Sequence, residues 1–159
     1  MKTTMIYESD AWRHLSIGRL LHNAISRFDA RVFKLLAEAG HGKVRQPHSN
    51  LTRNLDISGT RITELARRAE MTKQAMSELV VRCEKLGLVK RMTDPKDARV
   101  KIVTFTAAGL VWLEALKTAL QTAENEMRSE LGTLCVDGLA VALKSYGESY
   151  DPLRSDKVD

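Results

Sequence analysis

The sequence predicts a mainly α-helical fold with one small β-hairpin, and three observations support this. Only 5% of the 159 residues are aromatic and 3 are prolines, a composition that favours helices over a β-sandwich. Apolar residues recur at steps of three and four in two long stretches, one toward each end of the chain. A single pair of segments rich in β-branched residues flanks a polar loop between residues 88 and 105.

The composition also limits the class of protein. Hydrophobic residues make up 43% and charged residues 28%, as in a folded domain with a core of its own. No apolar run approaches the roughly 18–20 residues that span a membrane, and no secretory signal follows Met1. Two cysteines, Cys83 and Cys135, supply neither a disulfide framework nor a four-cysteine zinc site. We therefore expect a cytoplasmic protein that does not associate with a membrane.

The net charge of +5 is unevenly distributed. Residues 61–101 hold 11 basic and 6 acidic side chains, whereas residues 102–159 hold 5 basic and 9 acidic ones. A basic centre with an acidic end is typical of a module that binds a polyanion. A solvated charged face gives the same count, so charge alone leaves both interpretations open.

Residues 10–39 are predicted to form one long helix, with a possible bend. Gly40 and Gly42 would end it, because glycine tolerates the left-handed conformation of a helix stop. The apolar stripe is long for a helix that serves only its own small domain, so we expect a second surface, such as a partner subunit, to cover part of it. The stripe consists of Leu21, Ile25, Phe28, Val32, Leu35, Leu36 and Ala39.

A polar linker over residues 41–46 leads to a short helix over residues 47–54, with Pro47 in its first turn. A turn over residues 56–59 follows. The pattern then predicts a helix over residues 62–69, a tight turn at Glu70-Met71, and a second helix over residues 73–86. Thr72 is the expected N-cap of this second helix. We expect Met76, Leu79, Val80 and Cys83 to face inward, and Lys73, Gln74, Ser77, Val81 and Arg82 to face outward.

Strands are predicted over residues 88–92 and 100–105, with residues 93–99 as the loop between them. Thr106 would cap a long helix that reaches about Leu131, and Gly132-Thr133 would end it. A last helix spans roughly residues 136–146, and residues 151–159 are expected to fray. The seam of the long helix indicates helix-on-helix packing, and it consists of Leu113, Leu116, Leu120, Ala123, Met127 and Leu131.

The order short helix, tight turn, polar-faced helix and basic hairpin is that of a winged helix-turn-helix. A major groove admits one α-helix, and side chains near the N-terminus of that helix reach base edges. Gln74 can bond an adenine edge, Lys73 a guanine edge or a phosphate, and Arg99 can enter a minor groove. Asp97 would hold the Arg99 guanidinium in position. The candidate DNA-binding residues are Thr63, Thr72, Lys73, Gln74, Ser77, Arg82, Arg91, Lys96, Asp97 and Arg99.

From about Thr60 to Gly109 the sequence resembles the MarR family of bacterial transcriptional regulators. Asp94-Pro95-Lys96-Asp97-Ala98-Arg99 is similar to the family's D-P-x-D-x-R hairpin, and Thr106-Ala107-Ala108-Gly109 to its x-T-x-x-G helix start. The stretches Ile62-Thr63-Glu64-Leu65-Ala66 and Glu84-Lys85-Leu86-Gly87-Leu88-Val89 also resemble family motifs. Each piece alone is weak, and the combination at these spacings is specific.

The resemblance implies a homodimer that represses transcription from a pseudo-palindromic double-stranded operator, with recognition helices about 34 Å apart. A small effector, in many members a phenolic or aromatic carboxylate, would release the DNA. Candidate effector-binding residues are Trp12, His14, Arg19 and His48, since arginine binds carboxylates and tryptophan stacks on aromatic rings. Packing at a subunit interface and a salt bridge are the alternative roles of Trp12 and Arg19.

The resemblance also implies a division into an N-terminal dimerisation helix with a connecting helix (1–56), a DNA-binding lobe (57–105) and C-terminal dimerisation helices (106–159). Three features depart from the family pattern. Glu70 stands where the helix-turn-helix turn commonly has glycine or a small residue, Gly138 weakens the last helix, and the linker over residues 41–46 is long.

Other function classes are set against this interpretation. A winged-helix module that docks proteins would show apolar residues where Lys73, Gln74 and Arg99 stand. A thiol-based sensor would use Cys83 or Cys135, but an inward-facing cysteine is usually a small core residue. We find no nucleophile elbow, no glycine-rich phosphate loop and no histidine spacing for a metal, so we expect no enzyme, no cofactor and no metal site.

Overall fold

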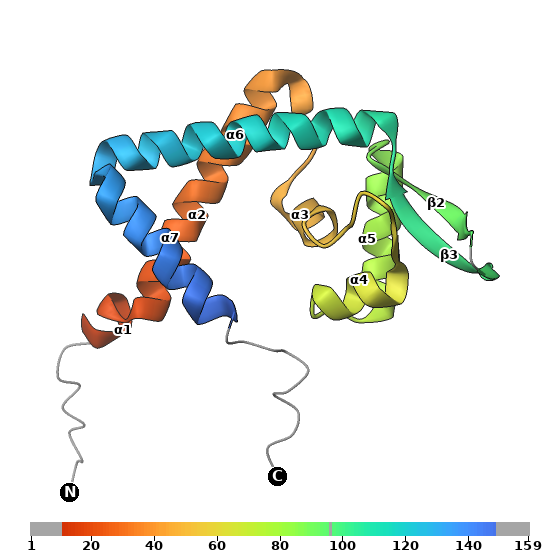
Figure 1. The fold of residues 1–159 in the computed structure, drawn as a ribbon, viewed down its shortest axis with the longest axis horizontal. Coiled ribbons are helices and arrows are strands. Elements are labelled where there is room, and N and C mark those ends of the chain that lie inside the picture. Colours follow the sequence, from red (N-terminus) through yellow and green to blue (C-terminus); the bar gives the residue numbers. More distant parts are fainter. Residues whose placement is uncertain (1–10, 96, 149–159) are drawn as a thin grey trace, which may run out of the picture. The chain divides into compact units, whose positions relative to one another are not determined.

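The computed structural model describes residues 11–95 and 97–148, so the predicted frayed tail at residues 151–159 lies outside the described residues. The chain divides into two compact units, residues 1–119 and residues 120–159. The elements, drawn in Figure 1, are α1 (Ala11–Leu15), α2 (Ile17–Leu36), the π-helical turn η1 (Ala37–His41), α3 (Gln46–Thr52), β1 (Thr60–Arg61), α4 (Ile62–Arg68), α5 (Lys73–Lys85), β2 (Val89–Asp94), β3 (Asp97–Phe105), α6 (Ala107–Leu131) and α7 (Thr133–Glu148).

The single helix predicted over residues 10–39 is interrupted. Ser16 adopts an extended conformation and caps α2, because its hydroxyl oxygen accepts a hydrogen bond from the Arg19 backbone N–H at 3.4 Å. The predicted stop at Gly40 is confirmed by its φ of +90°, whereas Gly42 has a right-handed φ of −64° and takes no part in the left-handed turn. Along α2 only Val32 and Leu36 are buried, and the earlier part of the stripe is exposed or half-buried.

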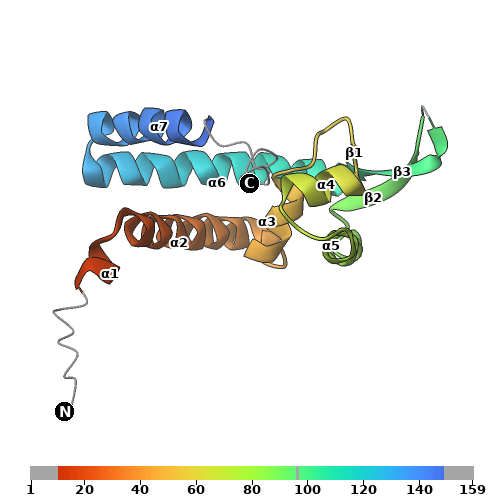
Figure 2. The ribbon, with the colours of Figure 1, turned by 90° about the horizontal axis from the view of Figure 1, so that it is seen from below.

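The wing is a three-stranded antiparallel sheet in the order β1–β3–β2, and its hairpin projects beyond the helices of its unit in Figure 2. The sequence predicted two strands, and β1 was missed because two residues carry no readable alternation. The loop predicted over residues 93–99 is also wrong. Strand β2 continues through Asp94 and β3 begins at Asp97, with a register shift at Thr93 and Asp94 that ends the regular ladder.

The core of the first unit lies under the helix-turn-helix and the sheet. Met76, Leu79, Val80 and Cys83 on α5 are buried, as predicted from their spacing. They are joined by Leu65, Ala66, Leu88, Val89, Val103, Phe105 and Trp112. The core therefore holds one face of α5 inward and leaves the opposite face free for a partner.

Helix α6 starts where Thr106 and Gly109 meet the chain before β2. The Thr106 hydroxyl oxygen accepts a hydrogen bond from the Gly109 N–H at 2.9 Å, which confirms the predicted cap, and the hydroxyl itself donates to the Gly87 carbonyl. A Cβ at Gly109 would lie 1.9 Å from the Leu88 carbonyl oxygen. Only glycine allows this close approach, which explains the T-x-x-G pattern physically.

The second unit comprises the end of α6 and α7. The predicted break at Gly132 is confirmed by a φ of +88°, and Arg128 reaches across it to Asp137 at 3.1 Å. Helix α7 continues through Gly138 and is longer than predicted. Most of its apolar side chains are exposed, with Leu134 at 91% and Tyr146 at 81%. No helix among the described residues is long and apolar enough to cross a membrane.

Candidate nucleic-acid interface

Four of the candidate DNA-binding residues lie at the N-terminus of α5. The Thr72 hydroxyl oxygen accepts a hydrogen bond from the Ala75 backbone N–H at 3.1 Å, which confirms it as the N-cap. Lys73 and Gln74 are exposed in the first turn of α5. The Ser77 hydroxyl donates to the Lys73 carbonyl at 2.7 Å, so only its oxygen lone pairs are left to accept from a partner.

The turn before α5 is tight although it contains a glutamate. Glu70 adopts a left-handed φ of +51°, a conformation that suits glycine better, and the Met71 N–H donates to the Ala66 carbonyl at 2.9 Å. The departure noted in the sequence is therefore accommodated with local backbone strain, and α4 and α5 keep the packing of a helix-turn-helix.

The wing presents Arg99 to solvent. Its side chain is 91% exposed, and Asp97 contacts it twice: Oδ1 accepts from the Arg99 backbone N–H at 3.0 Å and from Nε at 3.2 Å. The predicted positioning role of Asp97 agrees with these contacts. The guanidinium keeps its two terminal nitrogens for another partner. Lys96, the third predicted wing residue, lies outside the described residues.

The remaining candidate DNA-binding residues differ in their exposure and in their ion-pair partners. Thr63 is exposed in the first turn of α4, and Arg82 is exposed with only a distant Glu78 at 3.9 Å. Arg91, in contrast, binds Glu84 through Nε at 3.0 Å and Nη2 at 2.7 Å. This two-bond contact joins α5 to β2, and it raises the pKa of Arg91. Arg91 is thus engaged in holding the wing against the recognition helix.

Sequence reasoning missed an ion-pair network below α4. Glu64 accepts from Arg67 and from Arg68 Nε at 2.8 Å, while Arg68 also reaches Asp56 at 3.0 Å. The hydrogen bonds from Arg67 and Arg68 lower the pKa of Glu64 to about 2. The i, i+3 and i, i+4 spacings from Glu64 would have indicated the first part of this network. Nothing in the spacing indicates the contact with Asp56.

A second missed contact joins the two edge strands of the sheet. Arg61 in β1 donates from Nε at 3.3 Å and from Nη2 at 2.9 Å to Oδ2 of Asp94 in β2. Asp94 is buried, although it belongs to the loop in the sequence-based prediction. These residues are 33 positions apart, so no local pattern could have paired them.

The two thiols differ in burial. Burial raises the pKa of the Cys83 thiol to about 11, which keeps it protonated and disfavours a redox role. Cys135 is exposed at the start of α7. Within residues 11–95 and 97–148 no group of three or more histidine, cysteine, aspartate or glutamate side chains is arranged to hold a metal ion.

The structure brings together two of the four effector candidates. Trp12 and Arg19 line an open hollow of about 560 Å³ on α1 and α2, and His14 and His48 are not part of it. His48 instead accepts a hydrogen bond at Nδ1 from the Arg45 backbone N–H at 2.9 Å, and burial lowers its pKa. His22, which sequence reasoning did not select, also lines the hollow, together with Arg13, Ser16 and Gly18.

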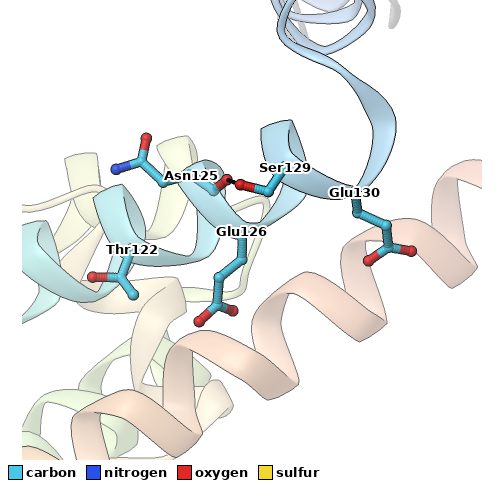
Figure 3. Close-up of a pocket in the computed structure, with 5 residues that line it drawn as sticks. All are labelled: Thr122, Asn125, Glu126, Ser129 and Glu130. Atoms are coloured by element: carbon cyan, nitrogen blue, oxygen red, sulfur yellow. Dashed lines mark hydrogen bonds between the residues drawn. The ribbon is translucent and has the colours of Figure 1, made fainter.

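A second hollow, of about 550 Å³, lies along α6 and is drawn in Figure 3. Its lining residues are Thr122, Asn125, Glu126, Ser129 and Glu130, and the Ser129 hydroxyl donates to the Asn125 carbonyl at 3.0 Å. With two carboxylates and no cation in its lining, this hollow would repel an acidic effector, unlike the hollow at Arg19.

The sequence and the fold were compared with those of known proteins. Residues 49–100 match the model of the MarR family. No curated protein matches the sequence. Solved structures of similar fold include MarR of E. coli without ligand, which is 21% identical at a TM-score of 0.65, with 82% of this chain and 96% of that chain covered.

Two further structures of similar fold contain the protein CouR. CouR of Rhodococcus jostii bound to p-coumaroyl-CoA is 23% identical, with 87% of this chain and 95% of that chain covered at a TM-score of 0.66. CouR bound to a 23-mer DNA duplex is 23% identical, with 86% and 96% covered at a TM-score of 0.67. The family match over residues 49–100 covers most of the helix-turn-helix and the wing, and the chain has a fold similar to that of the solved MarR and CouR structures.

Proposed function

We propose that this protein is a dimeric, sequence-specific double-stranded DNA-binding repressor that acts in the cytoplasm and is released by a small aromatic effector. The observation that carries the DNA-binding part is the pairing of an exposed α5 N-terminus with an exposed wing arginine. Lys73 and Gln74 project from the face opposite the buried core residues, and Asp97 orients Arg99 while leaving its terminal nitrogens available.

The polar character of this surface distinguishes DNA binding from protein docking. A docking helix needs exposed apolar anchors, whereas the first two turns of α5 present Lys73, Gln74 and the half-buried Ser77. CouR, whose structure has a similar fold, is bound to a 23-mer DNA duplex, and this supports DNA binding over protein docking.

The DNA-binding part is tested with duplexes selected by the purified protein from a random pool. Arg99→Ala is expected to weaken binding to a selected duplex strongly and to leave the dimer intact. Gln74→Ala is expected to cost about 1–3 kcal/mol at one base pair and to relax the preference there. Fluorescence anisotropy measures both. Lys117→Ala removes an exposed cation of α6, outside the lobe, and serves as the matched control with unchanged affinity.

Two outcomes would contradict this assignment. Unchanged affinity of the Arg99 variant would remove the wing from the interface. An equal loss on every duplex for the Gln74 variant would make that side chain a phosphate contact instead of a base reader.

The effector part rests on the hollow on α1 and α2. Arg19 offers a guanidinium for a carboxylate, and the exposed Trp12 offers a ring face for an aromatic group. A structure of similar fold is the Mycobacterium tuberculosis MarR-family protein in complex with p-aminosalicylic acid, 23% identical, with 82% of this chain and 98% of that chain covered at a TM-score of 0.62. We infer a small aromatic acid as the ligand class.

A thermal-shift series with p-aminosalicylate, salicylate and p-coumarate tests this inference, because a ligand that prefers the folded protein raises its apparent stability. The shift is expected in the wild type and in Arg53→Ala, which removes an exposed arginine at the C-cap of α3, and it is expected to disappear in Arg19→Ala. A shift that persists in Arg19→Ala would place the ligand elsewhere, and no shift with any acid would contradict the ligand class.

A further inference from the structure

The ion pair between Arg61 and Asp94 spans the whole width of the wing sheet. Arg61 lies in edge strand β1, where its backbone pairs with Ile102 of the central strand β3. Asp94 ends the other edge strand, β2. The two hydrogen bonds to Asp94 Oδ2 therefore cross β3 and tie the two edges of the sheet together (Figure 2 shows the three strands).

The two partners differ in burial. The Asp94 side chain is 10% exposed and the Arg61 side chain 52% exposed. A carboxylate removed from water needs a charged or hydrogen-bonding partner, and Arg61 provides two N–H donors. The Arg61 side chain, by contrast, stays about half exposed to solvent. This asymmetry makes the pair a fixed anchor for the carboxylate instead of a mobile surface contact.

The anchor sits at a junction along the hairpin. The regular ladder of β2 and β3 ends at Thr93, and after a register shift Asp94 is paired with Asp97. Asp97 in turn holds the backbone and side chain of Arg99. The part of the wing that carries Arg99 therefore begins at Asp94, the residue to which Arg61 is hydrogen-bonded.

Arg61 also belongs to the helix-turn-helix. It is the N-cap residue of α4, with an extended backbone directly before Ile62. A contact from this residue to Asp94 links the start of α4 to the tip of the wing without passing through the ladder of hydrogen bonds between β2 and β3.

We infer that Arg61 and Asp94 are positioning residues that fix the direction of the wing tip relative to the helix-turn-helix, so that Arg99 and α5 meet the same duplex. This inference rests on the proposed DNA-binding function. It assigns a role to two residues that touch no DNA themselves and act through Arg99.

A double-mutant cycle with Arg99 separates positioning from a general loss of stability. The probe is a fluorescein-labelled duplex selected by the wild-type protein. Arg61→Gln is expected to weaken binding on the order of tenfold when Arg99 is present, and by less than about twofold when Arg99 is already alanine. Arg61→Lys keeps the charge and one donor and is expected to recover part of the loss.

Arg68→Gln is the matched control, because Arg68 is another arginine of the lobe that pairs with carboxylates. Its effect on affinity is expected to be the same with and without Arg99. If a urea titration shows that Arg61→Gln is already unfolded without urea, Asp94→Asn, which keeps the side-chain shape, takes its place. Asp94→Asn is expected to show the same dependence on Arg99 as Arg61→Gln.

The outcomes distinguish the two levels of inference. If Arg99→Ala weakens binding but the Arg61 and Asp94 variants lose the same factor in both backgrounds, the positioning role is wrong and the DNA-binding function stands. If selection from the random pool yields no duplex that the wild type binds, both fail together.

Discussion

The winged-helix lobe and the flanking helices differ in how far their apolar side chains are buried. In the lobe, α5 places Met76 and Val80 in a core closed by its own chain, and both are completely buried. On α2 and α7, Ile25 is 50% exposed and Val141 is 70% exposed. The lobe buries its apolar side chains against its own chain, whereas many apolar side chains of α2 and α7 are exposed.

Ion pairs join different elements in both regions. In the lobe they run from Arg61 to Asp94 and from Arg91 to Glu84, and at the end of α6 one runs from Arg128 to Asp137. What distinguishes α7 is its exposed apolar side chains, of which Leu134 and Tyr146 are the most exposed. A contiguous exposed apolar surface marks an interaction site. We propose that the lobe binds a charged partner and that the flanking helices bind an apolar one, a second copy of the chain.

The largest expected effect concerns the helices. Ile25→Glu places an unpaired charge among the exposed apolar side chains of α2, and Val141→Glu does so on α7. Burying either charge in an interface would cost about 3–5 kcal/mol, at least a hundredfold in the dimer dissociation constant. Sedimentation equilibrium of the purified variants measures this constant.

Asn23→Glu adds the same charge at an exposed polar position of α2 and is the matched control. It is expected to leave the dissociation constant unchanged. A wild type that stays monomeric at micromolar concentration would contradict the comparison itself, since the exposed stripe would then have another purpose.

Local rules predicted most of the lobe. The N-cap at Thr72, the inward face of α5 and the cap at Thr106 follow from neighbouring residues, and the structure confirms them. The contact between Asp97 and Arg99 is also local, two positions apart, and could be inferred from the chemistry of the hairpin.

Contacts between distant segments could not be predicted in this way. Strand β1 is two residues long and exists because Thr60 and Arg61 pair with Val103 and Ile102 of β3. The loop was predicted too long because Asp94 looks like a turn residue, although it is buried against Arg61. Polar residue types indicate a loop only when their charges have no partner elsewhere in the fold.

A middle-sized effect tests how closely the lobe is packed where α6 begins. Gly109→Ala would bring a methyl group to 1.9 Å from the Leu88 carbonyl oxygen, so the backbone has to shift. We expect a loss of about 1–3 kcal/mol in the free energy of unfolding, measured by urea denaturation.

Gly138→Ala on α7 is the counterpart in the flanking helices. Its added methyl group would meet nothing within 4 Å, and alanine favours a helix over glycine by about 0.5–1 kcal/mol. This variant is expected to raise the stability. If Gly138→Ala instead lowers the stability, a partner approaches α7 closely at this position, and this part of α7 is covered in the assembled protein.

The smallest effect is a pH dependence of the lobe that the flanking helices should not share. Arg67 and Arg68 lower the pKa of Glu64 from 4.5 to about 2 in the folded state. A carboxyl group with a depressed pKa stabilises the fold fully above about pH 4.5 and loses this contribution as the pH falls toward 2. In urea titrations, the wild type is expected to exceed Glu64→Gln in stability at pH 7 and to lose this advantage progressively between about pH 4.5 and 2. The effect is small because Glu64 interacts near the surface, where water screens the pairs. A difference that stays constant over this range would mean that the carboxylate charge does not contribute, and that the network acts through packing alone.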